Sequence, residues 1–169
     1  MERGGGMVHL GERAIDDLVA RAATSPRRRL NLNLHVSPAD PIQRFLNAGA
    51  PGSYVRPHRH AASRWELFTA LRGRIGVILF DEAGAVTHRH RLEAGTGELI
   101  EIPGGTWHSF VFALPGSVAL EVKPGPYVAA SDKEMAPWAP DEGEAAAPAC
   151  AVWLETAQPG ARWRPDRAE

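Results

Sequence analysis

The sequence predicts an all-β domain, folded as a single barrel or sandwich, with one short amphipathic helix near the N-terminus. Three observations lead to this prediction. Apolar residues recur at helical intervals between Leu10 and Ala22, short apolar or alternating runs follow from Leu30 to Lys123, and turn residues separate these runs. A chain of 169 residues is long enough to bury the core of one such domain.

The predicted helix comes first along the chain. Its apolar residues are Leu10, Ala14, Ile15, Leu18, Val19 and Ala22, and charged residues lie between them. Because a proline disfavours the helical conformation of the residue before it, we expect this helix to end before Pro26.

Nine segments then carry the pattern of short strands. They are 30–36, 42–47, 53–57, 65–71, 75–80, 86–92, 98–102, 108–113 and 118–123. Gly- and Pro-containing segments at 81–84 and 114–117 predict hairpin loops between strands.

After Lys123 the composition shifts towards proline, alanine and acidic residues. We expect 141–148 to be a loose tail and 152–154 to return to the barrel as a strand. This organisation predicts a helix and leading strand at 1–40, a barrel at 41–128 and a C-terminal extension at 129–169.

Four residues in the predicted barrel form a candidate metal site: His58, His60, Glu66 and His108. Side chains two residues apart on a strand point to the same face, so His58 and His60 direct two imidazoles to one place. A carboxylate and a third imidazole from other strands would complete a site for one divalent transition metal. Imidazole and carboxylate ligands suit manganese, iron, zinc, nickel or cobalt.

Alternatives exist for some of these residues. Glu66 could instead form a structural salt bridge with Arg56 or Arg64. A second pair, His88 and His90, repeats the two-residue spacing, but arginines alternate with it as on a solvated hairpin, and we interpret it as surface.

Glycines and prolines frame the candidate ligands in two regular blocks. The first block runs from Gly52 to Gly73, and the second runs from Gly97 through the turn at 103–105 to His108. These blocks resemble the two sequence motifs of the cupin superfamily. The resemblance implies a cupin barrel, that is, a double-stranded β-helix or jelly roll, whose metal ligands would be His58, His60, Glu66 and His108. Compared with the general cupin pattern, the gap before Glu66 is one residue longer and Phe112 stands where many cupins have Asn.

A second resemblance, to the WbuC family of cupin-fold metalloproteins, covers the chain from about Leu10 to about Pro140. The segments that carry it are 25–29 (SPRRR), 33–35 (NLH), 43–47 (QRFLN), 54–60 (YVRPHRH), 65–68 (WELF), 101–108 (EIPGGTWH) and 121–127 (EVKPGPY). The spacing between His60 and Glu66 is similar to that of this family. The family takes its name from a protein of bacterial O-antigen gene clusters, so the resemblance implies a link to cell-surface polysaccharide.

Polar residues near the motifs are candidates for ligand contacts and proton transfer. Arg44, Asn47, Lys123 and Tyr127 could bind an anion or a sugar, and Glu66, Lys123 and Tyr127 are the candidate catalytic residues. Arg56 is a further candidate for such contacts, and surface ion pairing or strand-end capping is the alternative for Arg44, Asn47, Arg56, Lys123 and Tyr127.

Composition limits the class of partner. Nineteen basic and 20 acidic residues give a net charge of −1, so no overall field attracts nucleic acid or an anionic membrane. The single cysteine and the lack of a long apolar run predict a cytoplasmic protein. The cupin resemblance implies a homodimer.

The first functional hypothesis is a metal-dependent enzyme or binding protein for a carbohydrate or sugar phosphate linked to O-antigen biosynthesis. A non-catalytic metal-stabilised binding module is the second hypothesis. An iron-dependent dioxygenase is the third, because iron in such a site can activate dioxygen.

Overall fold

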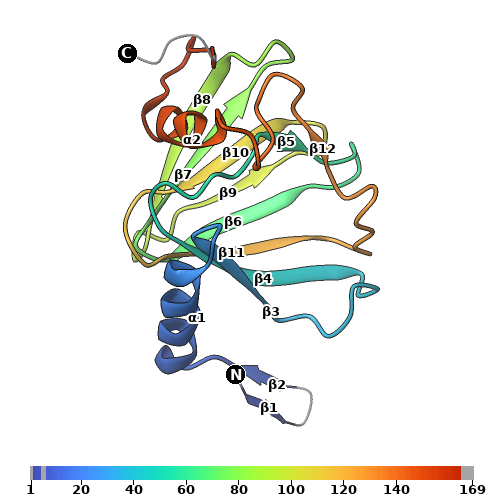
Figure 1. Ribbon diagram of the computed structural model, residues 1–169. Coiled ribbons are helices and arrows are strands. Elements are labelled where there is room, and N and C mark those ends of the chain that lie inside the picture. The colour runs from blue at the N-terminus through green and yellow to red at the C-terminus, as the bar shows by residue number, and fades with distance from the viewer. Residues whose placement is uncertain (1, 5–6, 165–169) are drawn as a thin grey trace.

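Two five-stranded antiparallel sheets face each other in the computed structural model, which describes residues 2–4 and 7–164 (Figure 1). Sheet 1 has the order β12-β5-β10-β7-β8, and sheet 2 has the order β3-β4-β11-β6-β9. The strands of sheet 1 are β12 (Glu134–Met135), β5 (His58–Arg59), β10 (Trp107–Phe112), β7 (Arg74–Phe80) and β8 (Val86–Glu93). Those of sheet 2 are β3 (Arg29–Asn33), β4 (Ile42–Gly49), β11 (Ser117–Pro124), β6 (Glu66–Arg72) and β9 (Leu99–Ile102).

The space between the sheets is filled by the inward-facing residues of both layers. On β10, Phe110 and Phe112 enter this inner core, whereas Val111 between them belongs to a separate cluster on the outer side. The same alternation on β7 sends Val77 inwards and Ile78 outwards. The predicted all-β class is therefore confirmed, with both faces of sheet 1 buried against other elements.

Helix α1 (Glu12–Thr24) covers the outer face of sheet 2, where Leu18 and Ala22 pack against residues of β4 and β11 (Figure 1). It confirms the predicted N-terminal helix and ends two residues before Pro26. The Ser25 hydroxyl donates a hydrogen bond of 2.9 Å to the Ala22 carbonyl, one of the oxygens that the helix end leaves open. Before α1, β1 (Glu2–Gly4) and β2 (Met7–His9) pair as a short hairpin that the sequence did not indicate.

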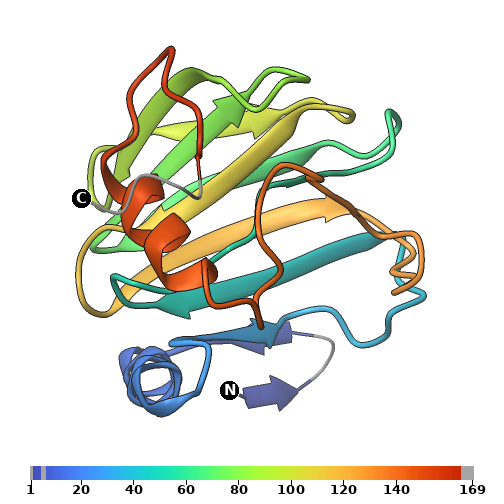
Figure 2. The same ribbon diagram turned by 45° about the horizontal axis from the view of Figure 1, so that its top comes forward.

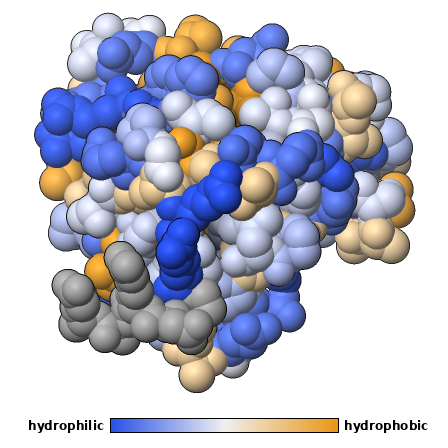
Figure 3. All heavy atoms as spheres, turned by 90° about the horizontal axis from the view of Figure 1, so that it is seen from above, coloured by the Kyte–Doolittle hydropathy of each residue, from blue (hydrophilic) through white to orange (hydrophobic). Residues whose placement is uncertain are grey.

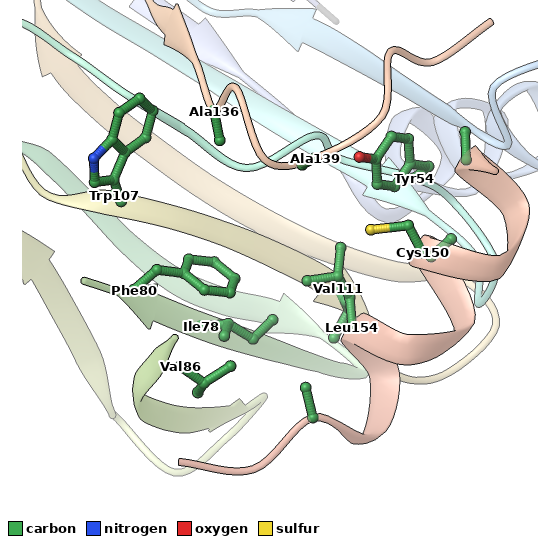
Figure 4. Close-up of a cluster of buried hydrophobic side chains, with 13 residues drawn as sticks. Tyr54, Ile78, Phe80, Val86, Trp107, Val111, Ala136, Ala139, Cys150 and Leu154 are labelled. Atoms are coloured by element: carbon green, nitrogen blue, oxygen red, sulfur yellow. The ribbon is translucent and has the colours of Figure 1, made fainter. Parts of the chain in front are cut away.

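Helix α2 (Ala147–Thr156) covers the outer face of sheet 1 (Figure 2). Cys150 and Leu154 are buried there with Phe80, Val111 and other apolar side chains, as Figure 4 shows. The predicted strand at 152–154 is therefore wrong, and 147–148 belong to the helix rather than to a loose tail. The buried residues Cys150, Ala151, Leu154 and Ala157 recur at helical spacing, a signal that the proline and alanine content obscured.

The other predicted strands are confirmed with small shifts at their ends, except for 53–57, which has no ladder partner. In that segment, side-chain donors form hydrogen bonds with main-chain carbonyls in place of a neighbouring strand. The Tyr54 carbonyl accepts from Arg29 Nη1 at 2.7 Å, and the Val55 carbonyl accepts from the Ser109 hydroxyl at 2.6 Å. Strand β5 starts only at His58, after Pro57, which has no N–H to donate.

The two predicted loops have different roles. Residues 81–84 connect β7 and β8, which pair as a hairpin as predicted. At 114–117, the chain passes from β10 of sheet 1 to β11 of sheet 2, which begins at Ser117, so this loop crosses between the sheets and the hairpin prediction is wrong there.

Neither helix in the described part of the chain has the length and apolar run that a membrane-spanning helix needs. The face seen from above is largely hydrophilic, and its hydrophobic residues form small separate groups (Figure 3).

Candidate metal centre and its cavity

His58, His60, Glu66 and His108 meet between the two sheets at one end of the inner core. His58 on β5 is the register partner of His108 on β10, and their ring centroids lie 4.5 Å apart. His60 follows β5 directly, and Glu66, the first residue of β6, faces the three imidazoles from the opposite sheet. All four side chains are buried, with exposed fractions of 2–4%.

One potential ligand atom from each of the four residues lies within 4.8 Å of the others. Donors bound to the same ion at about 2.0–2.2 Å can be at most about 4.4 Å apart, so a shift of a few tenths of an ångström closes the group around one cation. Among the described residues, no second group of three or more histidine, cysteine or acidic side chains has this geometry.

Main-chain carbonyls fix the orientation of each imidazole. Nδ1 of His58 lies 2.9 Å from the Arg56 carbonyl oxygen, and Nδ1 of His108 lies 2.9 Å from that of Thr106. Nδ1 of His60 bonds to the Asp132 carbonyl oxygen. Because a carbonyl can only accept, each Nδ1 carries the proton and each Nε2 keeps a free lone pair, the arrangement of metal-binding histidines.

Two of the free Nε2 atoms, those of His60 and His108, face Glu66. His60 Nε2 lies 2.9 Å from Glu66 Oε1, and His108 Nε2 lies 2.8 Å from Glu66 Oε2. Within the described part of the chain, neither nitrogen has a hydrogen-bond partner of acceptable geometry, and neither has Glu66 Oε2. Buried lone pairs this close repel each other unless a cation lies between them, so the donor set fits a metal ion.

Electrostatics keep two of the donors in the form that a metal requires. Burial, assisted by the neighbouring His108 and Lys133, lowers the pKa of His58 well below its ordinary value, so this imidazole is neutral. Burial by itself would raise the pKa of Glu66, but positive charge on His108 and His60 beside the carboxylate outweighs it and holds this pKa well below the usual range, and a metal ion in the place of those protons would have the same effect. Glu66 is therefore a carboxylate.

The alternative role of Glu66, a salt bridge with Arg56 or Arg64, is not what the structure contains. Arg56 pairs with Asp141, and Arg64 Nη1 pairs with Asp132 Oδ1 at 3.1 Å. Both arginines thus bind acidic residues of the C-terminal segment instead of Glu66.

A buried lysine joins the metal site to two further carboxylates. Lys123 Nζ lies 3.5 Å from Glu66 Oε1, 3.6 Å from Glu121 Oε1 and 3.2 Å from Asp132 Oδ2. Burial would lower the pKa of Lys123, but the three carboxylates outweigh it and the pKa is raised. Burial and the nearby Glu66 raise the pKa of Glu121 well above its usual value, and Glu121 Oε2 accepts from Asn47 Nδ2 at 2.7 Å.

Glu121 and Asp132 were not identified by sequence reasoning. Glu121 stands two residues before Lys123 on a strand, so the same-face rule could have placed both in the interior. Asp132 lies in a loop after the barrel, and no local pattern marks it.

A cavity of about 770 Å³ opens onto the metal site. His58 and Glu66 form part of its wall, and Phe45, Phe110 and Phe112 contribute aromatic surface. Its other polar lining residues include Asn31, Asn33, Gln43, Asn47, Glu121, Lys123, Tyr127, Asp132 and Lys133.

Of the residues predicted to contact a ligand, Asn47, Lys123 and Tyr127 line this cavity. Arg44 does not: it is exposed, and its Nη2 lies 3.6 Å from Asp40 Oδ2. His88 and His90 are exposed on β8 with parallel rings, apart from the metal site, as the sequence indicated.

One protein-family model matches part of the chain. Residues 10–92 match a family model described as a domain of unknown function (DUF6016). No curated protein matches the chain.

Several solved structures have a similar fold. One is CapF with the inhibitor 3-isopropenyl-tropolone, with 19% identity, a TM-score of 0.54, and coverage of 66% of this chain and 32% of CapF. Oxalate oxidase in complex with glycolate has 16% identity, a TM-score of 0.50 and coverage of 69% and 59%. Oxalate decarboxylase from Bacillus subtilis has 18% identity, a TM-score of 0.50 and coverage of 63% and 27%.

The chain thus spans less than two thirds of each of these proteins. The likeness concerns the fold, and the buried group of three histidines and one glutamate lies between the two sheets of that fold. The chain has a cupin fold with a buried candidate site for a divalent transition metal.

Proposed function

We propose that this chain is a metal-dependent enzyme or binding protein for a hydroxylated small molecule, with carbohydrates and sugar phosphates as the ligand class. The observation that carries the proposal is the cavity of about 770 Å³ that opens onto the candidate metal ligands. A cavity of this volume is in the range that holds a small ligand.

The lining of the cavity suits a sugar. Asn31 and Asn47 each use one amide hydrogen within the protein and keep the other, with the amide oxygen, for hydroxyl groups. Gln43 donates to two main-chain carbonyls, so its oxygen remains as an acceptor. The rings of Phe45 and Phe110 provide apolar surface for the C–H groups of a sugar ring. Two proteins of similar fold hold small molecules, glycolate in oxalate oxidase and the inhibitor 3-isopropenyl-tropolone in CapF.

A metal held by His58, His60, Glu66 and His108 would act as a Lewis acid on a ligand oxygen or lower the pKa of a bound water. The chain's own residues would set up the rest of the site. Lys123 keeps its proton between three carboxylates, which suits it to stabilise negative charge rather than to act as a base. Tyr127 lines the cavity and offers a hydroxyl for ligand binding or proton transfer.

The link to O-antigen biosynthesis rests on the WbuC resemblance and is part of this proposal. A cytoplasmic location, a homodimer and the three-part organisation at 1–40, 41–128 and 129–169 also remain predictions. Residues from each of these parts line the cavity, among them Arg29, Lys123 and Lys133. Size-exclusion chromatography with light scattering would test the homodimer.

The proposal is tested with purified protein loaded with one metal at a time. Binding and turnover of sugars, sugar phosphates and sugar nucleotides are compared with those of the His58→Ala variant. Binding that disappears with the metal supports the proposal, and turnover that disappears with it identifies an enzyme. Binding without turnover identifies a binding module. Equal binding and turnover for the wild type and the variant would show that the function does not depend on the metal.

A further inference from the structure

Lys133 is a residue of the cavity that neither the sequence motifs nor the metal ligands account for. It directly precedes β12, whose residues Glu134 and Met135 pair in register with Arg59 and His58. Glu134 bonds to the Arg59 guanidinium at 2.8 and 3.1 Å. Because side chains alternate along an extended chain, Lys133 and Met135 share the other side, and both line the cavity.

The two lysines of the chain differ in their partners. Lys123 has three carboxylates within 3.6 Å. For Lys133, by contrast, the described residues provide neither a hydrogen bond nor an ion pair, although its charge acts on His58, Glu66 and Glu121. The Lys133 side chain keeps contact with solvent at the cavity, and partial removal from water together with the nearby ammonium of Lys123 lowers its pKa, so its positive charge has no carboxylate partner among the described residues.

The charges around the metal site also favour an anionic ligand. Lys123, Lys133 and Arg64 face the carboxylates of Glu66 and Asp132, whereas burial and Glu66 disfavour the charged form of Glu121, and His58 is neutral. A divalent ion then adds two positive charges to this end of the cavity. An anionic ligand would complement both the ion and the lysine that lacks a partner.

We propose that Lys133 binds an oxyanionic group, a carboxylate or a phosphate, on a ligand that occupies the cavity beside the metal site. This inference rests on the proposed function, because it names the charge of the ligand that the same cavity holds. An ammonium group binds either oxyanion by charge-assisted hydrogen bonds. Lys133 is then a specificity residue, supplied by the segment after the barrel.

The test uses metal-loaded full-length protein and three related probes: glucose, glucuronate and glucose 6-phosphate, with inorganic phosphate as a fourth. Affinities are measured by isothermal titration calorimetry for the wild type, for Lys133→Gln and for Arg13→Gln. Arg13 is exposed on α1, so its substitution removes one positive charge away from the cavity. Metal content and unfolding midpoint of the three proteins are compared first, because an unchanged fold and metal site make the affinities comparable.

We expect at least one anionic sugar to bind about 10-fold or more tightly than glucose to the wild type and to Arg13→Gln. Lys133→Gln should lose most of this preference, and the preferred probe decides between carboxylate and phosphate. Loss of metal or of the fold in Lys133→Gln would contradict the inference, since Lys133 would then have a structural role.

Other outcomes separate this inference from the proposed function. If glucose and both anionic sugars bind equally, the inference is wrong and the carbohydrate proposal stands. If inorganic phosphate binds in a Lys133-dependent manner and none of the sugars binds, the anion site stands and the carbohydrate proposal is wrong. If none of the four probes binds, both are rejected for these ligand classes.

Discussion

The main-chain oxygen of Asp132 accepts a hydrogen bond from Nδ1 of His60, so a loop after the barrel orients a candidate metal ligand in its interior. The Asp132 side chain strengthens this connection, because it also binds Lys123 and Arg64. The segment beyond the barrel is therefore part of the metal site and not only an appendage to it.

This connection predicts the effect of Asp132→Asn. The substitution keeps the shape but removes a 2%-exposed carboxylate from between two cations, so we expect a loss of about 3 kcal/mol in the free energy of unfolding. Metal affinity should fall about 10- to 100-fold, because the loop that is less firmly held by Lys123 and Arg64 positions the main-chain oxygen for His60 less well. Denaturant unfolding and metal titration measure the two effects. Asp17→Asn, on the exposed side of α1, is the matched control and should change neither.

Removal of a ligand should abolish metal retention. We expect His58→Ala to bind metal more than about 100-fold more weakly than the wild type, because it loses a direct ligand rather than a supporting group. His88→Ala removes an exposed imidazole from the other His-x-His pair and should retain the full metal content. Elemental analysis of the freshly purified proteins makes the comparison. Equal metal in all three would rule out ligation by His58.

Metal retention should depend on pH in one direction. The pKa of His58 lies well below 6.5 in the folded chain, so the neutral imidazole persists at neutral pH and is protonated only in acid. Metal content should stay constant from about pH 8 to the ordinary histidine pKa and then fall towards about pH 4. Unfolded His58 takes up its proton at higher pH than folded His58, so the free energy of unfolding should also decrease as pH falls below 6.5. Metal content that is unchanged over this range would argue against histidine ligation.

The three carboxylates around Lys123 predict that a second substitution partly restores the stability lost in Lys123→Met. Lys123→Met leaves Glu66, Glu121 and Asp132 without the cation that they share, and we expect a cost of about 3–5 kcal/mol in the free energy of unfolding. Adding Glu121→Gln should recover part of this loss, because it removes the carboxyl group whose charged form burial and Glu66 already disfavour. Chemical denaturation of both variants measures the recovery; a double variant less stable than Lys123→Met would contradict the charge network.

Helix α2 should contribute to the stability of the whole domain. Leu154 is 1% exposed in the outer cluster on sheet 1, so Leu154→Ala should lower the free energy of unfolding by about 2–5 kcal/mol. Val152 lies on the same helix but is 61% exposed, and Val152→Ala should change this free energy by less than about 0.5 kcal/mol. If both variants unfold like the wild type, α2 is not docked in solution.

The sequence by itself determined the fold class, helix α1, most strands of the barrel and the candidate metal ligands. These features depend on local periodicity and on spacing: a His-x-His pair on a strand has one geometry, and the strand containing it needs only neighbours to complete the site. The alternation that buries Phe110 and Phe112 can likewise be read without coordinates.

Only the tertiary structure decided how the segment after Lys123 is used. Asp132 and Lys133 approach the metal site through pairing of β12 with β5, a contact between residues about 75 positions apart that no local pattern encodes. The long-range packing of α2 likewise decided between helix and strand at 152–154. Local propensity acts within a few residues, whereas the charge, access and shape of the cavity depend on which distant segments the folded chain brings together.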